Sequence, residues 1–298
     1  MDIRRYLQEK KEWVDSALEA YFPKREELTS SLHNAMRHSL FAGGKRIRPI
    51  LSIASFEAAG GKGERILPFA CALEMIHTYS LIHDDLPALD NDDYRRGKPT
   101  CHKVFGEAVA LLAGDGLLTE AFRLMANRVG KGHFPSDDAV ALDLINEVGQ
   151  AAGVLGMVGG QVVDVESEGK TVDLPTVQYI HTRKTGAMIL VSVRVGARLA
   201  GAQEPLLRFL TRYGESLGLA FQIADDILNV EGKSALMGKK TGSDLSKGKA
   251  TYPSVLGLEE SKARAKELVG MAVDALKPLG AEADPLREIG RFVIAREY

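Results

Sequence analysis

Residues 67–85, LPFACALEMIHTYSLIHDD, form an apolar stretch that ends in two aspartates. Its apolar side chains recur at steps of three, four and five residues, and this spacing predicts a helix with a buried face. Residues 175–199 and 215–230 behave similarly, with Pro175 suited to a first helical turn and Gly201 suited to a helix end. No series of alternating strands joined by hairpin turns is evident. We therefore expect an all-α protein.

The chain contains 298 residues and no segment typical of a long flexible linker. Residues 108–113 and 151–158 are apolar on nearly all sides, as in helices inside a large bundle. The helical pattern is interrupted at residues 60–63, 87–99, 130–138, 166–175 and 231–252. A length of about 150 residues per domain would suggest two domains, but that prior is soft. We expect one large helical domain over residues 1–298.

The formal net charge is close to zero, at −2 from 38 basic and 40 acidic residues. This argues against nucleic-acid binding through a general basic field, so anion binding requires local clusters. The two cysteines, Cys71 and Cys101, fit neither a disulfide framework nor a zinc site and favour a reducing compartment. The charged N-terminus lacks an apolar signal core, and no apolar run approaches the roughly 18 residues of a membrane helix. We expect a cytoplasmic protein without membrane insertion.

The first acidic motif places five aspartates between positions 84 and 93, with no basic residue before Arg95. So many carboxylates are costly to pack together unless cations neutralise them. Such clusters suit hard divalent ions, and Mg²⁺ usually takes substrate phosphates into its coordination shell. Because the residue before Pro87 is pushed out of helical geometry, Asp84 and Asp85 should end a helix. Asp90 should follow on a loop that curls back toward the same ion.

A second acidic motif, ADDILN, occupies residues 224–229. Asp225 and Asn229 are one helical turn apart and share a face, whereas Asp226 points about 100° away. A lone aspartate pair is usually a solvated helix end. Two such motifs, each after a strongly apolar helix, favour a metal-binding role instead.

Basic residues form several local clusters. GGKRIRP at 43–49 presents Lys45, Arg46 and Arg48 beside two glycines, a plausible diphosphate cradle, although such a cluster is more often a solvated surface. Arg95 and Arg96 directly follow the acidic loop, and Lys239 and Lys249 lie after the second acidic motif.

Lys184 and Thr185 lie in HTRKTGAM, inside an otherwise apolar helix. The lysine could simply extend to water, but Gly186 marks a place where the backbone kinks or approaches another segment. His77 lies on nearly the same helical face as Asp84, where a structural core histidine is an equal alternative. The basic sites are separate in sequence from the acidic motifs. This indicates two diphosphate substrates, one bound through metal and one through basic side chains.

The stretch HTYSLIHDDLPALDNDDYRRGKPTCHK closely resembles the bacterial short-chain trans-prenyltransferases, the farnesyl diphosphate synthases. GGKRIRP, HTRKTGA, GLAFQIADDILNV and KATYPSVLGL continue the resemblance in the family's order, from about residue 30 to the C-terminus. The resemblance implies a homodimer whose all-helical subunits surround a deep central cavity. It also implies condensation of isopentenyl diphosphate with an allylic diphosphate, using about three Mg²⁺ ions per site, with Mn²⁺ as a substitute.

The same resemblance implies roles for individual residues. Aspartates from two walls bind Mg²⁺: Asp84 and Asp90 with Asp85 in support, and Asp225 with Asp226. The allylic diphosphate is held by three side chains, Arg95, Lys184 and Lys239, and Lys249 lies nearby as a further substrate-binding residue. Four others hold isopentenyl diphosphate: Lys45, Arg48, His77 and Arg96. Catalysis falls to Arg95, Lys184, Thr185 and Gln222, of which the last two line the path of the developing allylic cation.

One position departs from the family pattern, because the second motif usually ends in aspartate and here ends in Asn229. We expect activity to survive with weaker metal affinity. Product length should depend on Tyr79 or Ser80, which precede Asp84 by five and four residues, although helical geometry alone leaves open which of them faces the cavity. A bulky residue at the place of Tyr79 goes with farnesyl diphosphate in the resembling enzymes.

Several alternatives remain. A geranylgeranyl diphosphate synthase would share the mechanism and make a longer product. A terpene cyclase would use the same metal chemistry with one diphosphate site, against which Lys45 and Arg48 argue. A noncatalytic prenyl synthase subunit would normally lose acidic residues, and only Asn229 suggests this. A purely structural helical bundle would show no stabilisation by Mg²⁺ and pyrophosphate.

Overall fold

The computed structural model describes residues 1–23, 28–127, 138–231 and 248–295. Its elements are α1 (Ile3–Tyr21), α2 (Ser30–Leu40), α3 (Ile47–Ala58), η1 (Glu64–Ile66), α4 (Leu67–Asp84), β1 (Tyr94–Arg95), β2 (Lys98–Pro99), α5 (Cys101–Phe105), α6 (Glu107–Ala126), α7 (Asp138–Ala152), α8 (Met157–Ser167), α9 (Leu174–Ile180), η2 (His181–Gly186), α10 (Ala187–Leu199), α11 (Glu204–Glu231), α14 (Tyr252–Leu256), α15 (Leu258–Ala275), η3 (Ala281–Ala283) and α16 (Asp284–Ala295). The predicted all-α class is confirmed. The two strands form only a short antiparallel hairpin.

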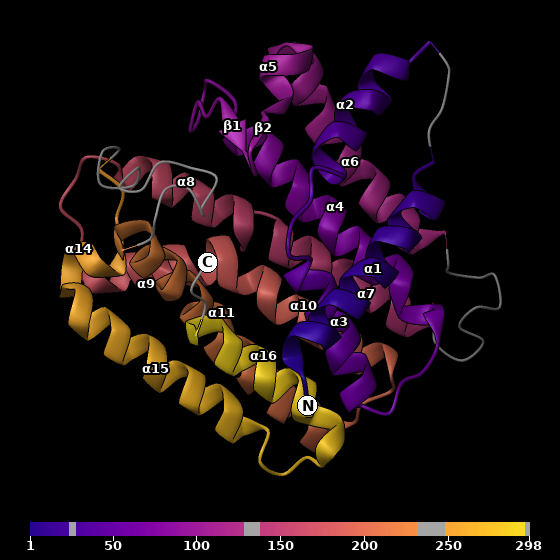
Figure 1. Ribbon diagram of the computed structural model, residues 1–298, viewed down its shortest axis with the longest axis vertical. Coiled ribbons are helices and arrows are strands. Elements are labelled where there is room, and N and C mark those ends of the chain that lie inside the picture. The colour runs from indigo at the N-terminus through magenta and orange to yellow at the C-terminus, as the bar shows by residue number, and fades with distance from the viewer. Residues whose placement is uncertain (24–27, 128–137, 232–247, 296–298) are drawn as a thin grey trace.

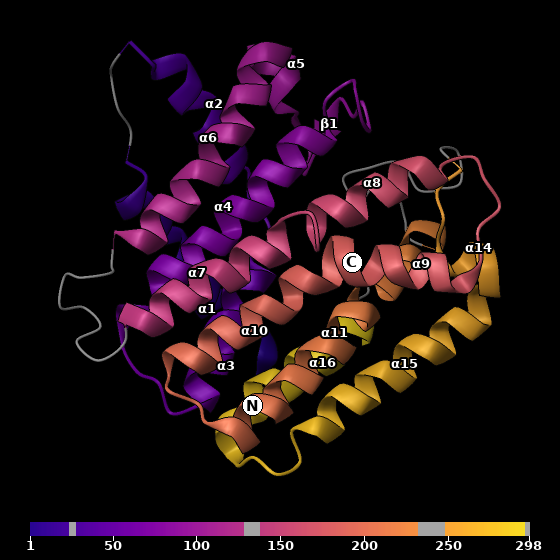
Figure 2. The same cartoon turned by 180° about the vertical axis from the view of Figure 1, so that it is seen from behind.

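The helices are arranged around α3 and α10 (Figures 1 and 2). One side holds α1, α2, α4 and α6, and the opposite side holds α11, α15 and α16. Helices α4 and α6 pack along each other, as do α11 and α15. The segment from α8 to η2 lies beside α11, against which η2 packs.

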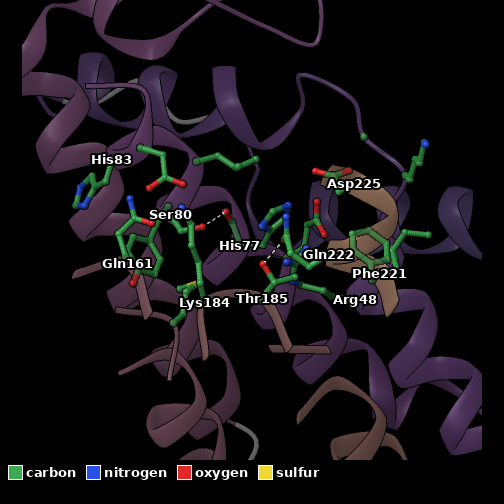
Figure 3. Close-up of a pocket in the computed structure, with 18 of the residues that line it drawn as sticks. Arg48, His77, Ser80, His83, Gln161, Lys184, Thr185, Phe221, Gln222 and Asp225 are labelled. Carbon is green, nitrogen blue, oxygen red and sulfur yellow. Dashed lines mark hydrogen bonds between the residues drawn. The ribbon is translucent and has the colours of Figure 1, made fainter. Parts of the chain in front are cut away.

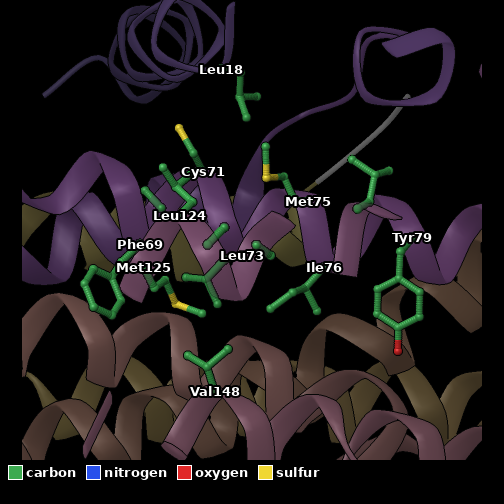
Figure 4. Close-up of a cluster of buried hydrophobic side chains, with 14 of the residues drawn as sticks. Leu18, Phe69, Cys71, Leu73, Met75, Ile76, Tyr79, Leu124, Met125 and Val148 are labelled. Carbon is green, nitrogen blue, oxygen red and sulfur yellow. The ribbon is translucent and has the colours of Figure 1, made fainter. Parts of the chain in front are cut away.

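Helix α4 is buried along most of its length and carries the start of the first acidic motif at its end. Phe69, Leu73 and Ile76 are fully buried, and Met75 is nearly so, on different sides of the helix (Figure 4). A helix that is apolar all round requires neighbours on every side, and α1, α3 and α6 supply them. The predicted helix at residues 67–85 is therefore confirmed.

The end of α4 is shaped as Pro87 predicts. The helix ends at Asp84, and Asp85 forms its cap. The backbone N–H of Asp90 then donates to the carbonyl oxygen of Asp84 at 2.8 Å. This bond turns the loop back toward the helix end, so that the first and third aspartates of the motif lie near each other.

The predicted helix at 175–199 is continuous but contains a wider turn. Asp173 caps its start by accepting from the N–H of Thr176 at 3.0 Å, with Pro175 in the first turn. Residues His181–Gly186 form a π-helical turn, a form that is frequent at functional sites. The close approach expected at Gly186 is real, because a Cβ atom on Gly218 of α11 would lie 2.8 Å from the Cα atom of Gly186.

Two segments expected inside the bundle lie partly on its surface. Leu111 and Leu112 of α6 are 47% and 55% exposed, and Val154 and Leu155 before α8 are 78% and 66% exposed. The expectation that both segments lie inside the bundle was wrong for these residues, because nothing in the described part of the chain covers them.

One stretch of the described chain, Asp138–Ser167, is apolar and long enough by composition alone to cross a membrane. It comprises α7, α8 and the turn between them, and 33% of its most apolar window is buried in the fold. Core helices of soluble proteins pass the same test, so this is a weak indication. The expectation of no membrane insertion stays a prediction.

Candidate active site

A cavity of about 880 Å³ lies between α3, α4, α8, η2 and α11. Its walls bring together many residues that sequence reasoning selected: Lys45, Arg48, His77, Tyr79, Ser80, Asp84, Arg96, Lys184, Thr185, Gln222 and Asp225. Figure 3 shows Arg48, His77, Lys184, Gln222 and Asp225 converging from segments that are far apart in the chain. The expected deep cavity is therefore present, and both anion-binding and cation-binding groups face it.

Arg48, His77 and Arg96 form a basic part of the wall. Burial lowers the pKa of Arg48 to about 10, and the charge of Arg96 acts in the same direction, yet the guanidinium stays charged at neutral pH. Burial and the neighbouring arginines hold the pKa of His77 well below its ordinary value, so this imidazole is neutral. Within the described chain, the buried Nε of Arg48 has no hydrogen-bond partner. Crowded, desolvated cations of this kind suit a bound anion.

The two glycines before Lys45 make room for Arg96. Gly44 has φ +123°, and a Cβ atom there would lie 2.6 Å from the Cζ atom of Arg96. The Arg96 guanidinium also donates to the carbonyl oxygen of Gly43. The glycines therefore position an arginine from the loop after the first acidic motif, a contact that the local sequence did not reveal.

Arg46 differs from its neighbours in the basic cluster. Its guanidinium donates to Asp15 at 2.8 Å, to Glu74 at 2.6 Å and to the carbonyl oxygen of Leu40 at 2.8 Å. The residue is 3% exposed, and these carboxylates raise its pKa although burial alone would lower it. Arg46 thus joins α1, α2 and α4, whereas Lys45 and Arg48 of the same cluster line the cavity.

The acidic wall consists of Asp84 and Asp225, from α4 and α11. Burial raises the pKa of Asp84, and Lys184 opposes that shift. Among the described residues, no group of three or more His, Cys, Asp or Glu side chains is arranged to hold a metal ion. Facing carboxylates without a complete cage fit Mg²⁺, which binds through one or two carboxylates and completes its shell with substrate phosphates and water.

Asp85 and Arg95 are paired with each other and are absent from the cavity lining. Arg95 donates from Nε at 2.8 Å and from Nη2 at 2.5 Å to the Asp85 carboxylate, which is 3% exposed. Although burial lowers the pKa of an arginine, the bonds and charge of Asp85 raise that of Arg95. The pair fixes the hairpin to the end of α4.

Lys184 of η2 extends to α8, where its Nζ atom lies 2.6 Å from Asp164 Oδ2. A Cβ atom on Gly160 would lie 2.3 Å from the backbone nitrogen of Lys184, so only glycine allows α8 to pack this closely. Sequence reasoning missed α8, which also contributes Met157, Val158 and Gln161 to the cavity. The run GGQVVD at 159–164 was the available signal.

Thr185 and Gln222 lie side by side, with the hydroxyl donating to Gln222 Oε1 at 2.7 Å (Figure 3). Asp226, in contrast, does not line the cavity. Its carboxylate accepts from Gln222 Nε2 at 3.1 Å and from the backbone N–H of Tyr252 at 3.0 Å. His181 Nε2 lies 3.0 Å from the same carboxylate. The 100° offset expected between the two aspartates of the second motif thus separates a cavity residue from a buried one.

Tyr79 and Ser80 both line the cavity. Helical geometry alone had left open which of the two faces it. Tyr79 is 6% exposed, and its ring meets His83 edge-on at 5.6 Å. Burial raises the pKa of Tyr79 to about 12, so the phenol is neutral. A bulky neutral ring on the wall of the apolar part of the cavity is suited to limit the length of a hydrocarbon chain.

The remaining predicted site residues are absent from the cavity lining or lie outside the described part of the chain. Asp90 and Lys249 are paired at 2.8 Å and are absent from the cavity lining. Asn229 is likewise absent from the lining. Lys239 lies outside the described residues.

Comparisons with known proteins give a consistent result. The family model described as polyprenyl synthetase matches residues 29–277. The chain is 48% identical over 298 residues to a protein of Geobacillus stearothermophilus named farnesyl diphosphate synthase, covering 100% of this chain and 99% of that protein. It is 47% identical to a protein of Cyanophora paradoxa named geranylgeranyl diphosphate synthase, covering 98% and 95%. A solved apo structure described as an FPP/GFPP synthase from Zymomonas mobilis superposes with a TM-score of 0.86 at 37% identity, covering 98% of this chain and 99% of that chain.

Proposed function

Because this chain belongs to the polyprenyl synthetase family, we propose that it condenses isopentenyl diphosphate with dimethylallyl or geranyl diphosphate. The products are farnesyl diphosphate and pyrophosphate. The observation that carries this proposal is one cavity with two kinds of diphosphate site: carboxylates at Asp84 and Asp225, and cations at Arg48 and Arg96. A terpene cyclase needs only the first kind.

The basic wall is the proposed site for isopentenyl diphosphate. Lys45, Arg48 and Arg96 supply positive charge, and guanidinium groups form paired hydrogen bonds with phosphate oxygens. The neutral His77 can donate or accept one hydrogen bond without adding repulsion to this crowded group. These side chains would bind the isopentenyl diphosphate directly, without a metal ion between them and the phosphate oxygens.

The allylic diphosphate is proposed to bind at the acidic wall. Asp84, Asp90 and Asp225 would hold Mg²⁺, with Asp85 in support. We propose about three ions, with Mn²⁺ as a substitute. When bound, Mg²⁺ neutralises the diphosphate and stabilises it as a leaving group. The proposed cationic partners of this diphosphate are Arg95, Lys184, Lys239 and Lys249.

The chain's own residues then guide the carbon chemistry. Lys184 stabilises the charge that develops on the departing diphosphate, while Thr185 and Gln222 place oxygen atoms beside the allylic cation. The isopentenyl double bond attacks the allylic carbon, and the released pyrophosphate is the proposed proton acceptor. The enclosed apolar part of the cavity excludes water, which would otherwise capture the cation.

Tyr79 favours farnesyl over geranylgeranyl diphosphate as the product. Tyr79 lines the cavity and precedes Asp84 by five residues, about 7.5 Å along the helix axis. A geranylgeranyl diphosphate synthase remains the second candidate, because a relative with that name is 47% identical.

The exposed apolar residues of α6 and of the turn before α8 support a homodimer. Leu112, Val154 and Leu155 would leave an unusually apolar surface on a monomer, and a second copy of the chain would bury it. A mass near twice 32.3 kDa in light scattering would support this arrangement. A monomer at micromolar concentration would contradict it.

Residues 1–298 are proposed to form one domain, because the hydrophobic clusters share helices. Buried residues of α3 and α10 belong to two of these clusters, and α11 links two of them. A cytoplasmic location without a nucleic-acid partner or membrane insertion is also proposed. Cys71 and Cys101 are both free and buried, which suits a reducing compartment.

The deciding experiment incubates the purified chain with isopentenyl and geranyl diphosphates and Mg²⁺, followed by chromatography of the dephosphorylated products. Mainly farnesol is the expected result. Mainly geranylgeraniol would keep the reaction and change the product. Turnover of the allylic substrate alone would indicate a cyclase, and no turnover would indicate a noncatalytic subunit.

A further inference from the structure

Asp226 is the centre of a buried hydrogen-bond network that reaches the cavity through two other residues. Its Oδ1 atom accepts from Gln222 Nε2, and its Oδ2 atom accepts from the Tyr252 N–H and faces His181 Nε2. Asp226 and His181 are each 3% exposed. Gln222 in turn accepts from the Thr185 hydroxyl, which borders the cavity.

The partners determine which atoms carry hydrogen. His181 Nδ1 lies 2.7 Å from the carbonyl oxygen of Val177, and Nε2 lies 3.0 Å from the Asp226 carboxylate. The Tyr252 N–H donates to one oxygen of the Asp226 carboxylate, and Gln222 Nε2 donates to the other. Asp226 therefore acts only as an acceptor.

The orientation of the next two groups follows from this. An acceptor at Asp226 requires Gln222 to present its NH₂ group there, so Gln222 Oε1 must face Thr185. The Thr185 hydroxyl then has to donate to Gln222. Its hydrogen is directed at Gln222, and its oxygen lone pairs are left for whatever lies in the cavity.

We propose that Asp226 and His181 are positioning residues that orient Gln222 and Thr185 toward the allylic cation, and that Asp226 is not a metal ligand. This inference rests on the proposed function. Lone pairs on Thr185 stabilise positive charge, whereas a hydroxyl hydrogen in the same place would repel it. Asp225, which lines the cavity, keeps the metal-binding role of the second motif.

The test compares Asp226→Asn with Asp225→Asn. The amide introduced by Asp226→Asn can keep its oxygen toward Tyr252 and turn its NH₂ group toward Gln222, which would reverse the glutamine and then the threonine. We expect kcat to fall about 10- to 100-fold in Asp226→Asn. The KM for geranyl diphosphate, the Mg²⁺ concentration for half-maximal rate and the thermal stabilisation by Mg²⁺ with pyrophosphate should stay unchanged.

Asp225→Asn is expected to behave differently, with a higher Mg²⁺ requirement and less stabilisation by Mg²⁺ and pyrophosphate. The same response from Asp226→Asn would overturn the proposal, because it is the response of a metal ligand.

A second pair of variants examines the orientation directly. Gln222→Glu alone places its new carboxylate against that of Asp226, so that two acceptors face each other, and this should lower kcat. In the double variant Asp226→Asn with Gln222→Glu, the introduced amide donates to the introduced carboxylate, which again accepts from Thr185. Its kcat should therefore recover about tenfold relative to Asp226→Asn. Additive losses in the double variant, or a normal kcat in Gln222→Glu, would overturn the proposal. If the unsubstituted chain shows no condensation at all, the proposed function fails first, and this inference fails with it.

Discussion

The Nζ atom of Lys249 lies 2.8 Å from Oδ1 of Asp90, although 159 residues separate them in the chain. Both side chains are only 14% exposed. The pair connects the loop of the first acidic motif to the segment that leads into α14. A cation and a carboxylate expected to serve the same diphosphate are thus already held together before any substrate is bound.

Lys249→Met should tighten the binding of Mg²⁺ by itself. The lysine competes with a metal ion for Asp90 and also repels it, and both effects disappear in the variant. We expect about threefold tighter binding, equivalent to ~0.6 kcal/mol. The measurement is the thermal shift of the protein as a function of Mg²⁺ concentration, without diphosphate.

Lys103→Met is the matched control for this variant. It breaks another lysine–aspartate pair in the same region, at 2.9 Å from Asp93, with both side chains about half exposed. An exposed pair of this kind contributes little, so Mg²⁺ binding should not change. Equal behaviour of the two variants would argue that Asp90 does not meet the metal.

Tyr79→Ala should lengthen the product by at least one five-carbon unit. Removing the ring opens the buried wall of the cavity beside His83, where a growing chain would otherwise stop. Chromatography of the dephosphorylated products measures the change. Ser80→Ala, which removes only a hydroxyl from the adjacent cavity residue, should keep the fifteen-carbon product. An unchanged product in Tyr79→Ala would exclude a length-limiting role for this ring.

Gly114→Ala should also broaden the product distribution, through His83. A Cβ atom at position 114 would lie 2.1 Å from His83 Nε2, which also contacts the carbonyl oxygen of Leu111 at 2.9 Å. His83 must therefore move, and the ring of Tyr79 loses the neighbour that it meets edge-on. The same chromatography of dephosphorylated products measures this change.

The control for Gly114→Ala is Gly116→Ala on the same helix. Its new Cβ atom meets only the flexible end of Met36, at 3.1 Å. Alanine is a better helix former than glycine by about 1 kcal/mol, so this variant should be at least as stable as the parent and make the same product. A product shift in both variants would point to α6 in general and not to His83.

In the variant His77→Gln, the free energy of unfolding should change less with pH below pH 6.5. Burial and the arginines around it hold the pKa of His77 below the ordinary value of 6.5, so the unfolded chain takes up the proton first. The stability that His77 contributes above pH 6.5 is therefore lost as the pH falls from 6.5 toward the lower folded pKa. Removing His77 should therefore reduce the slope of the free energy of unfolding against pH by up to about 1.4 kcal/mol per pH unit in this range.

Urea unfolding between pH 5 and 8 measures this effect. Above pH 7.5 the difference in the free energy of unfolding between His77→Gln and the parent should be constant, which serves as the internal reference. A parallel pH dependence of the two proteins over the whole range would show that His77 takes up its proton equally in the folded and unfolded chains.

Several features were predictable because they depend on neighbours in the chain. The period of residues 67–85 predicted α4, and Pro87 predicted where it ends. The backbone bond from Asp90 to Asp84 realises the predicted return of the loop. The offset between Asp225 and Asp226 follows from helix geometry alone, and the structure places only Asp225 at the cavity.

The sequence by itself determined the helices, their ends, the chemical types gathered in each motif and the family resemblance, because periodicity, proline geometry and residue identity are local properties. Only the tertiary structure decided which charges face the cavity. Asp85 is paired with Arg95, and Asp226 is paired with His181. Lys184 is paired with Asp164 of α8, a helix that none of the sequence motifs indicated. The same holds for the exposed leucines of α6, because burial depends on what packs against a face. Such pairings join residues 10 to 45 positions apart through the packing of whole helices, and no local pattern encodes them.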